Sequence, residues 1–406
     1  MLRLKKKFSA LKLPSYDYMS RKGDNNRVLY VSPMIMTVDN GMMQRQHQWL
    51  KALCTAFPGR VDFLSLGSSP ASARNWLKER GMNITVLGGP FALVARLNAM
   101  AWYYGGVVLC NKLRWVDCFR FPFRTPLPHT WLRRYSTIVC YYAWNYHLLC
   151  LHRAGTRVLV DLGDIMADRH ERVGRRRWIS LAKKDELAIV TGPGRCLAIS
   201  ASDRKEFARL YGVEMPLVPF VPPNSDTLLS LGPPIHKRTI GFIGAPSYLN
   251  EEILKLLACE DFLEALRQAG VELLVAGGIC RTANPVLLER LRAGGASVIG
   301  RVDDIRDFYR STTAILNPVG PSTGVKIKSV EALMAGRGLV TSHWGSDLTL
   351  EEAFPGQIET IDWPITAAAL AAACIELIER GDVEKGNSGF AYRNRSEATM
   401  QEHILA

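Results

Sequence analysis

Short runs of apolar, often β-branched residues alternate with stretches of helical periodicity along the whole chain. Several of these runs are continuously apolar, which is typical of strands that are covered on both faces of a sheet. Strands that alternate with helices predict βαβ units and parallel sheets, because two parallel neighbours need a crossover connection. The runs that we interpret as strands are 27–33, 61–67, 83–89, 137–143, 157–164, 195–200, 239–245, 271–278, 297–302, 313–319 and 338–343.

A concentration of prolines near the middle of the chain indicates a boundary between two domains. PLVPFVPPN (216–224) and LGPPIHK (231–237) carry these prolines, and 406 residues are enough for more than one domain. We therefore predict an α/β protein with two doubly wound, Rossmann-like domains of parallel sheet. The expected divisions are a basic N-terminal segment (1–26), a first domain (27–220), a Pro-rich linker (221–236), a second domain (237–385) and a C-terminal tail (386–406).

The formal net charge of +13 favours acidic partners such as nucleotides or an anionic membrane. Part of the excess lies in MLRLKKKFSALK (1–12), and another part in the arginines between Arg169 and Arg177. Either a solvated basic surface or contact with an anionic membrane leaflet accounts for each cluster. We expect no nucleic-acid partner, since no recognised binding module or aromatic-basic repeat is present.

The absence of several sequence motifs argues against several classes of protein. The nine cysteines are scattered and include no CxxC pair, and the histidines are too dispersed for metal ligation. No secretory signal or membrane-spanning run is evident, which predicts a soluble or peripheral protein. A P-loop, a nucleophile elbow and a G-x-G-x-x-G fingerprint are also missing, which weighs against P-loop and NAD-dependent chemistry.

One strand–loop–helix unit, GPSTGVKIKSVEALMAG (320–336), concentrates groups that bind anions. We expect its helix to begin near Gly324, and the first amides of a helix have no partner inside it and carry partial positive charge. Ser322 and Thr323 can cap the helix or bond a phosphate oxygen. Lys326 and Lys328 add positive charge beside this positive helix end, a conflict that an incoming anion would resolve.

Glu331 lies two turns further into the same expected helix. Phosphates at the helix start and a carboxylate further along suit a nucleotide sugar, whose ribose hydroxyls the carboxylate would bond. Gly244 ends another predicted strand, and glycine there allows the backbone to approach a ligand closely. An ordinary βα unit with a solvated glutamate is the alternative interpretation.

The first half of the chain offers candidates for the other side of a cleft. Gly41 precedes a helix whose apolar stripe belongs to the core. Arg45, in the first turn of that helix, is as consistent with solvated surface as with a bond to an acceptor or phosphate. Asp164 stands at the carboxyl end of a predicted strand, with Arg169 after it, and is a better candidate for the cleft than Asp161.

Segment 300–342, GRVDDIRDFYRSTTAILNPVGPSTGVKIKSVEALMAGRGLVTS, resembles the donor-binding half of family-4-type (group 1) glycosyltransferases of the GT-B fold. Segment 239–257 is similar to the first unit of that half, and 30–53 and 157–169 resemble parts of the acceptor half. The resemblance implies a GT-B-like fold, in which two Rossmann-like domains face each other across a cleft. It also implies that the second domain binds the nucleotide sugar, that the first binds the acceptor, and that the tail crosses back to the first domain.

Three positions depart from the family pattern. Thr323 stands where the first of two paired glutamates is expected, which puts contacts to the donor sugar in doubt. Gly163 replaces the histidine of a D-x-H-D motif. No basic residue follows Gly244, and Lys326 is the residue to which we assign that phosphate-binding role.

The resemblance implies transfer of a sugar from a nucleotide sugar to a glycan or lipid-linked acceptor in cell-surface polysaccharide biosynthesis. Retention of configuration and independence of metals and cofactors are also implied, with Lys326, Glu331 and Asp164 as catalytic residues. We expect a cytoplasmic protein with peripheral contact of residues 1–12 at the inner face of the membrane. A non-catalytic subunit that binds a nucleotide sugar and a nucleotide-sugar epimerase on the same fold are the alternatives.

Overall fold

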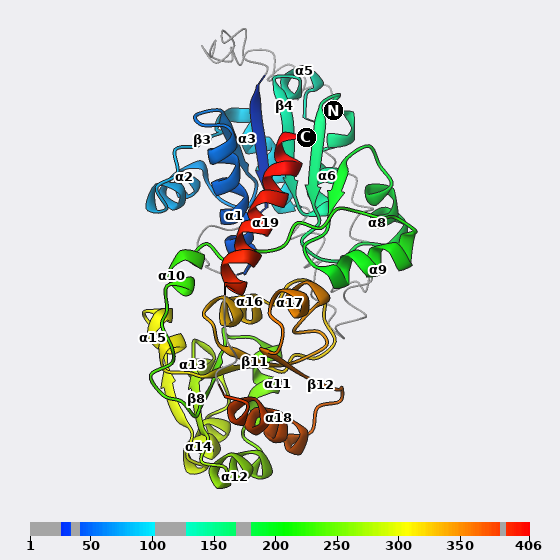
Figure 1. Cartoon of the computed structure of the whole chain (residues 1–406). Helices are drawn as coiled ribbons and strands as arrows, with labels where there is room; N and C mark the ends of the chain where they lie inside the picture. Colours follow the sequence, from blue (N-terminus) through cyan, green and yellow to red (C-terminus); the bar gives the residue numbers. More distant parts are fainter. Residues whose placement is uncertain (1–25, 34–40, 102–126, 168–179, 382–386) are drawn as a thin grey trace, which may run out of the picture.

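Two six-stranded parallel sheets form the framework of the protein (Figure 1). The computed structural model describes residues 26–33, 41–101, 127–167, 180–381 and 387–406. The strand orders are β3-β2-β1-β4-β5-β6 and β12-β11-β10-β7-β8-β9, which are the same order when each sheet is numbered from its own first strand. This is the order of the Rossmann fold, and it confirms the predicted fold class.

The first sheet lies in the N-terminal half of the chain, in the upper part of Figure 1. Its strands are β1 (Arg27–Ser32), β2 (Val61–Ser65), β3 (Thr85–Val86), β4 (Tyr135–Tyr141), β5 (Arg157–Asp161) and β6 (Arg195–Leu197). Its helices are α1 (Gly41–Ala56), α2 (Pro70–Glu79), α3 (Gly89–Ala101), α5 (His129–Leu132), α6 (Ala143–Leu148), η4 (Leu151–Arg153), α8 (Lys183–Val190) and α9 (Ala201–Tyr211).

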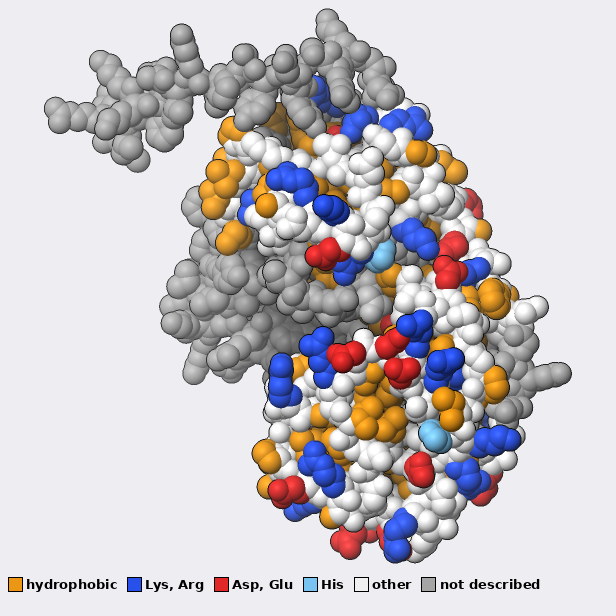
Figure 2. All heavy atoms as spheres, turned by 90° about the vertical axis from the view of Figure 1, so that its left-hand side faces the viewer, with side chains coloured by type: hydrophobic (Ala, Val, Ile, Leu, Met, Phe, Trp, Pro, Cys, Tyr) orange, Lys and Arg blue, Asp and Glu red, His pale blue; other side chains and the backbone are white. Residues whose placement is uncertain are grey.

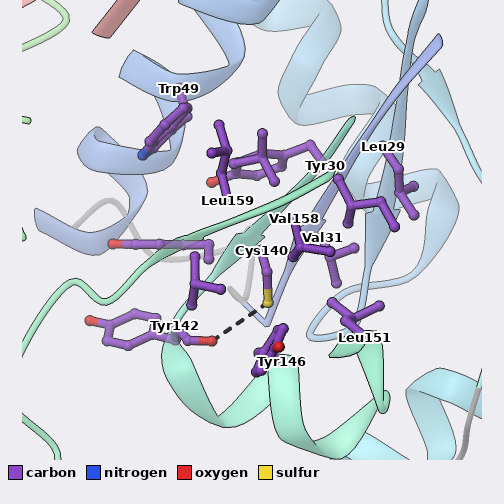
Figure 3. Packing of buried hydrophobic residues seen from close by; sticks show 14 of the residues in the cluster. Leu29, Tyr30, Val31, Trp49, Cys140, Tyr142, Tyr146, Leu151, Val158 and Leu159 are labelled. Carbon is purple, nitrogen blue, oxygen red and sulfur yellow. Dashed lines mark hydrogen bonds between the residues drawn. The ribbon is translucent and has the colours of Figure 1, made fainter. Parts of the chain in front are cut away.

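The middle strands of this sheet are buried on both faces. Figure 3 shows Tyr30 and Leu159 on the side of Trp49 from α1, whereas Val31 and Leu151 lie on the opposite side of the sheet. All five side chains are inaccessible to solvent. This two-sided burial explains why the strands are continuous apolar runs in the sequence.

The second sheet follows the linker helix α10 (Ser225–Leu229). Its strands are β7 (Thr239–Ile243), β8 (Glu272–Ala276), β9 (Ser297–Gly300), β10 (Ala314–Asn317), β11 (Gly338–Ser342) and β12 (Ile358–Ile361). Its helices are α11 (Tyr248–Leu257), α12 (Glu260–Gln268), α13 (Ile279–Thr282), α14 (Pro285–Ala293), α15 (Ile305–Arg310), α16 (Ile327–Met334), α17 (Leu348–Ala353) and α18 (Ala367–Glu379).

The last helix, α19 (Ser388–Leu405), returns to the first domain and packs against α1 (Figure 1). Met400 and Ile404 are buried in the core of that domain. Nearer the start of the helix, the Tyr392 hydroxyl donates to the carbonyl oxygen of Phe220 at 2.9 Å. The tail therefore contacts both the first domain and the chain that leaves it.

Two local features differ from the sequence-based expectation. β12 was not predicted, because IETI is a short run with two polar residues at a sheet edge. Helix α16 begins at Ile327 rather than near Gly324, since Gly324 has φ of +76° and Lys326 is extended. Among the described residues, no helix has the length and apolar character needed to span a membrane.

Candidate active site

The strand order of the second sheet reverses between β7 and β10, which are parallel neighbours in the sheet but far apart in the sequence. In open α/β sheets, ligands bind at this switch point, beyond the carboxyl ends of the strands. Gly244 follows β7 there, and a Cβ atom at Gly244 would lie 3.1 Å from the Asn250 side chain. The topology therefore brings the loop after β7 together with the loop between β10 and α16.

Lys328 of α16 reaches from the β10 side of the switch point to the β7 side. Its Nζ donates to Oδ1 of Asn250 at 3.0 Å and lies 4.6 Å from the centroid of the Phe242 ring. Burial lowers the pKa of Lys328 to about 7, and the charge of Glu331 opposes this shift only in part. Lys328 is therefore a partly buried amine next to Gly244, with a depressed affinity for its proton.

Glu331 is buried, with 8 % of its surface exposed, so the alternative of a solvated glutamate is wrong. The hydroxyl of Tyr309, on α15, donates to Oε2 of Glu331 at 3.2 Å. Burial and the neighbouring Glu331 both raise the pKa of Tyr309, which keeps its hydroxyl protonated as a donor. Glu331 is thus held in place by a neighbouring helix. We call Gly244, Asn250, Lys328 and Glu331 the switch-point cluster.

The loop before α16 contacts the first domain. Thr323 Oγ1 donates to Oδ1 of Asp164, and the amide of Gly324 donates to Oδ1 of Asp203 at 3.2 Å. The Nζ of Lys326 folds back and donates to the carbonyl oxygens of Thr323 and Gly324, both at 2.8 Å. We call Asp164, Asp203, Thr323, Gly324 and Lys326 the interdomain cluster.

Apart from Ser322, the predicted donor-binding residues are therefore divided between the two clusters. Lys328, not Lys326, lies beside Gly244, which corrects the expectation that Lys326 replaces the missing basic residue of the β7 loop. The predicted capping role of Ser322 and Thr323 is also wrong. Lys326 is the N-cap residue of α16 and its side chain makes no capping bond, while the Ser322 hydroxyl donates to the carbonyl oxygen of Gly320.

Asp203 and Asn250 are site residues that the sequence interpretation missed. Both lie three positions after a serine that caps a helix, because the amide of Asp203 donates to Ser200 and that of Asn250 to Ser247. This S-x-x-[D/N] pattern is a visible sequence signal for the first turn of a helix. Burial, followed by repulsion from Asp164, raises the pKa of Asp203 to about 6.

Arg45 does not face the cleft, which corrects its assignment to the acceptor side. It is 1 % exposed, and its guanidinium donates to Asp161 at 2.9 Å, to Gln48 at 2.8 Å and to the carbonyl oxygens of Val218 and Pro219 at 2.9 and 3.1 Å. These bonds use the donors that a ligand would need. Arg45 instead joins α1 and β5 to the chain that leaves the first domain.

Gly41 and Asp164 do lie at the contact between the two domains. A Cβ atom at Gly41 would lie 2.2 Å from Cδ1 of Ile327, the first residue of α16, so a larger residue at position 41 would force the Ile327 side chain to move. Asp164 is 6 % exposed and accepts the bond from Thr323. Arg169 and residues 1–12 lie outside the described residues. Figure 2 shows Lys, Arg, Asp and Glu side chains along the edge of the lower domain that faces the upper one.

Within the described ranges, no group of three or more His, Cys, Asp and Glu side chains is arranged to hold a metal ion. The carboxylates at the domain contact are instead bonded to amides and hydroxyls, as for Asp164 and Asp203.

Comparison with known proteins agrees with this geometry. Residues 237–380 match the family model described as "Glycosyl transferases group 1", and these residues contain the switch-point cluster. No curated protein sequence matches the chain. The resemblance to group 1 glycosyltransferases is thus confirmed for the second domain.

Solved structures resemble the chain over nearly its whole length. HepE of Anabaena, in complex with UDP, is 12 % identical, with a TM-score of 0.61 over 93 % of this chain and 98 % of that one. TarM of S. aureus, solved with UDP, is 9 % identical, with a TM-score of 0.59 over 94 % and 99 %. Sucrose-phosphate synthase of Thermosynechococcus elongatus is 14 % identical, with a TM-score of 0.56 over 94 % and 98 %. These likenesses confirm the GT-B fold.

Proposed function

We propose that this protein is a glycosyltransferase that uses a nucleotide sugar as donor and holds the donor's diphosphate at the switch-point cluster. The observation that carries this proposal is the position of Lys328, a partly buried amine beside Gly244 and Asn250 at the carboxyl edge of the second sheet. An amine with a pKa near 7 gains a proton readily when an anion binds beside it. The match of this domain to group 1 glycosyltransferases supports the same ligand.

Gly244, Lys328 and Glu331 of this cluster each have a role that follows from their surroundings. Gly244 lets the backbone approach the phosphates, because it has no side chain in the crevice. Protonated Lys328 would offset the negative charge that develops on the departing nucleoside diphosphate. Glu331, oriented by Tyr309, offers its carboxylate to ribose hydroxyls. These groups are fixed before the ligand arrives, so little reorganisation is needed during the reaction.

The interdomain cluster would position the donor sugar against the first domain. Asp164 and Thr323 bond each other across the cleft, and Thr323 occupies the position of the family's first glutamate. We assign Asp164 to contact with a sugar hydroxyl, and Lys326 to the fixed shape of the loop through its bonds to Thr323 and Gly324. Closure of the two domains would exclude water and limit hydrolysis of the donor.

The finer assignments are also part of the proposal. We propose a glycan or lipid-linked acceptor, a role in cell-surface polysaccharide biosynthesis, retention of configuration and catalysis without a metal. Contact of residues 1–12 with the inner face of the membrane would bring the enzyme to a lipid-linked acceptor, since each basic residue near an anionic surface contributes about 1 kcal/mol.

Thr323 also favours a second candidate, a non-catalytic subunit that binds the nucleotide sugar. A threonine hydroxyl cannot replace the charge of the family's first glutamate, and here it is bonded to Asp164. The two candidates share the donor site and differ in turnover. An epimerase would convert the donor with no acceptor at all.

Binding and turnover together test the proposal. Thermal unfolding in the presence of UDP, GDP, ADP and dTDP should reveal at least one diphosphate that stabilises the protein, because a ligand of the folded state raises its stability. Release of that diphosphate from the corresponding nucleotide sugars should then depend on added glycan acceptor. Binding without release would favour the non-catalytic subunit, and the absence of any stabilising diphosphate would contradict the donor site itself.

A further inference from the structure

One residue at the carboxyl edge of the first sheet has a strained backbone. Tyr142, directly after β4, has φ of +70° and ψ of 135°. Among the described residues, the one other non-glycine residue with a positive φ is Cys150, whose ψ of 39° lies in the ordinary left-handed region. The combination at Tyr142 lies outside the regions that L-residues normally occupy. Such an outlier indicates a functional constraint, because it persists only where the surrounding structure fixes it.

Tyr142 also lies at a point of the sheet where function is expected. The strand order of the first sheet reverses between β1 and β4, which are parallel neighbours. The carboxyl ends of these two strands therefore form the switch point of the first domain. This edge of the sheet faces the second domain, since Asp164, after β5, accepts a hydrogen bond from Thr323.

Hydrogen bonds on both sides of Tyr142 hold its backbone in this conformation. Its amide donates to the carbonyl oxygen of Asp161 at 2.8 Å. Its own carbonyl oxygen accepts from the amide of Asn145 at 3.2 Å and from Sγ of Cys140 at 3.7 Å, the bond drawn in Figure 3. A buried position alone does not require the strain, because Tyr141 is 2 % exposed and has no positive φ.

The ring of Tyr142 fills the space beside Gly163. A Cβ atom at Gly163 would lie 3.1 Å from Cε1 and 3.2 Å from Cζ of Tyr142, so a side chain at position 163 would compete with the ring for this space. Figure 3 shows the Tyr142 ring pointing away from Val31 and Leu151. Gly163 stands where the D-x-H-D motif of the related family has its histidine. The ring therefore takes the place of a side chain that this chain lacks.

The segment against which the ring packs touches the second domain. The carbonyl oxygen of Gly163 would lie 3.5 Å from a Cβ atom at Gly324, and the next residue, Asp164, accepts the bond from Thr323. Gly163 has φ of +68°, and glycine restricts the backbone less than any other residue. A neighbouring group must therefore limit the motion of this segment, and the Tyr142 ring is in contact with it.

We propose that Tyr142 is a positioning residue, whose ring replaces the missing side chain at position 163 and holds Asp164 against the loop before α16. The hydrogen bonds of its backbone fix the ring, and the ring limits the movement of Gly163 and Asp164. The importance of this contact for turnover rests on the proposed function, in which Asp164 contacts the donor sugar. The positioning itself does not rest on it.

Hydrogen–deuterium exchange of the full chain without ligand tests the positioning. In Tyr142→Ala, the amides of residues 320–327 should exchange about fivefold faster, as expected for the loss of one hydrogen bond between the domains. Tyr142→Phe keeps the ring and should exchange as the wild type does. Tyr135→Ala is the matched control, since Tyr135 is a buried tyrosine at the other end of β4. It should speed exchange in the first domain and leave residues 320–327 unchanged.

A swap of the two side chains tests the replacement. Gly163→His alone should collide with the Tyr142 ring and speed the exchange of residues 320–327, although histidine tolerates a positive φ better than most residues. Adding Tyr142→Gly removes both the ring and the strain, so the double variant should regain the wild-type exchange rate. A double variant that exchanges as fast as Gly163→His would contradict the replacement.

Donor assays on the same samples separate this proposal from the proposed function. Affinity for UDP should be unchanged in Tyr142→Ala, because the diphosphate is assigned to Gly244 and Lys328. The kcat for acceptor-dependent release of UDP from its nucleotide sugar should fall at least about tenfold, and Tyr142→Phe should restore it. A wild-type protein that does not bind UDP would count against the donor site, while the exchange rates would still decide the positioning.

Two results overturn the positioning role of Tyr142. The first is equal exchange of residues 320–327 in the wild type and in Tyr142→Ala. The second is an equally large increase for these residues in Tyr135→Ala, which would show that loss of any buried tyrosine from β4 has the same effect.

Discussion

Replacing Lys328 by methionine should remove both the affinity for a nucleoside diphosphate and the dependence of that affinity on pH. Methionine fills a similar volume beside Phe242 and Asn250 without the amine. The pKa of Lys328 falls from 10.5 to about 7 in the folded protein. Because each pKa unit corresponds to about 1.4 kcal/mol, protonating this amine costs on the order of 4–5 kcal/mol more than in water.

Because of this cost, Lys328 is mostly neutral in the free protein at about pH 8, and binding of a diphosphate should be coupled to proton uptake by the amine. At about pH 8, a group with a pKa near 7 is only about one-tenth protonated, so a diphosphate that restores its charge should bind with uptake of about 0.9 proton. Affinity for UDP should fall close to tenfold for each pH unit above about 8. The terminal phosphate, with a second pKa near 6, is already ionised there and contributes little.

Titration calorimetry in two buffers with different ionisation enthalpies measures this proton uptake directly. Lys328→Met should show neither uptake nor the steep pH dependence, and should bind UDP at neutral pH about 10- to 100-fold more weakly. Lys255→Met is the matched control, since Lys255 makes an exposed ion pair with Glu252 on α11. Wild-type binding without proton uptake at about pH 8 would refute the proposed contact between Lys328 and the phosphates.

The pH dependence of the free energy of unfolding is a second measurement that tests the lowered pKa of Lys328. The folded-state pKa of Lys328 is lowered, so between about pH 7 and 10 the unfolded chain binds more protons than the folded one. The free energy of unfolding is therefore highest above the ordinary pKa of 10.5, where the amine is neutral in both states. It falls as the pH falls toward 7, because the unfolded chain takes up the proton first. Urea unfolding should show wild-type stability rising with pH in this range relative to Lys328→Met.

Four further predictions follow from the site. Gly41→Ala should weaken UDP binding and cost about 1–3 kcal/mol through collision with Ile327, and adding Ile327→Val should restore binding, as calorimetry of the single and double variants would show. Arg45→Met should destabilise the protein by about 3–5 kcal/mol in urea unfolding, because it leaves the buried Asp161 carboxylate with the Trp49 indole as a donor but without a positive charge beside it. Asp203 has a raised pKa near 6, so its charge is unfavourable above that pH; Asp203→Asn should therefore be up to about 3 kcal/mol more stable than the wild type at about pH 8, and the gain should shrink toward pH 4. Glu331→Gln should weaken UDP binding several-fold but leave pyrophosphate binding unchanged, and equal losses for both ligands would contradict its assignment to the ribose.

Much of the fold could be predicted because its determinants are local. Each predicted strand overlaps a strand of the structure, since a strand that is buried on both faces consists of a continuous apolar run. β12 was not predicted, because an edge strand can be short and need not be a continuous apolar run. The start of α16 was misplaced by three residues, since the positive φ of Gly324 and the extended Lys326 depend on contacts with the first domain.

The candidate site was predictable in composition and not in arrangement. Gly244, Lys328 and Glu331 stood out as residue types that suit a nucleotide sugar, but periodicity could not show which lysine faces the β7 loop. Arg45 looked equally suited to surface and cleft until its bonds to Asp161 and the linker were visible. Long-range pairing of charges leaves no pattern in a single sequence.

A crystal structure of the protein with UDP tests the central claim most directly. The account predicts that the diphosphate lies at the switch point, within hydrogen-bonding distance of Nζ of Lys328 and against the backbone at Gly244, with the ribose at Glu331. Phosphorus atoms found in another part of the molecule, with Lys328 still bonded only to Asn250, would contradict it.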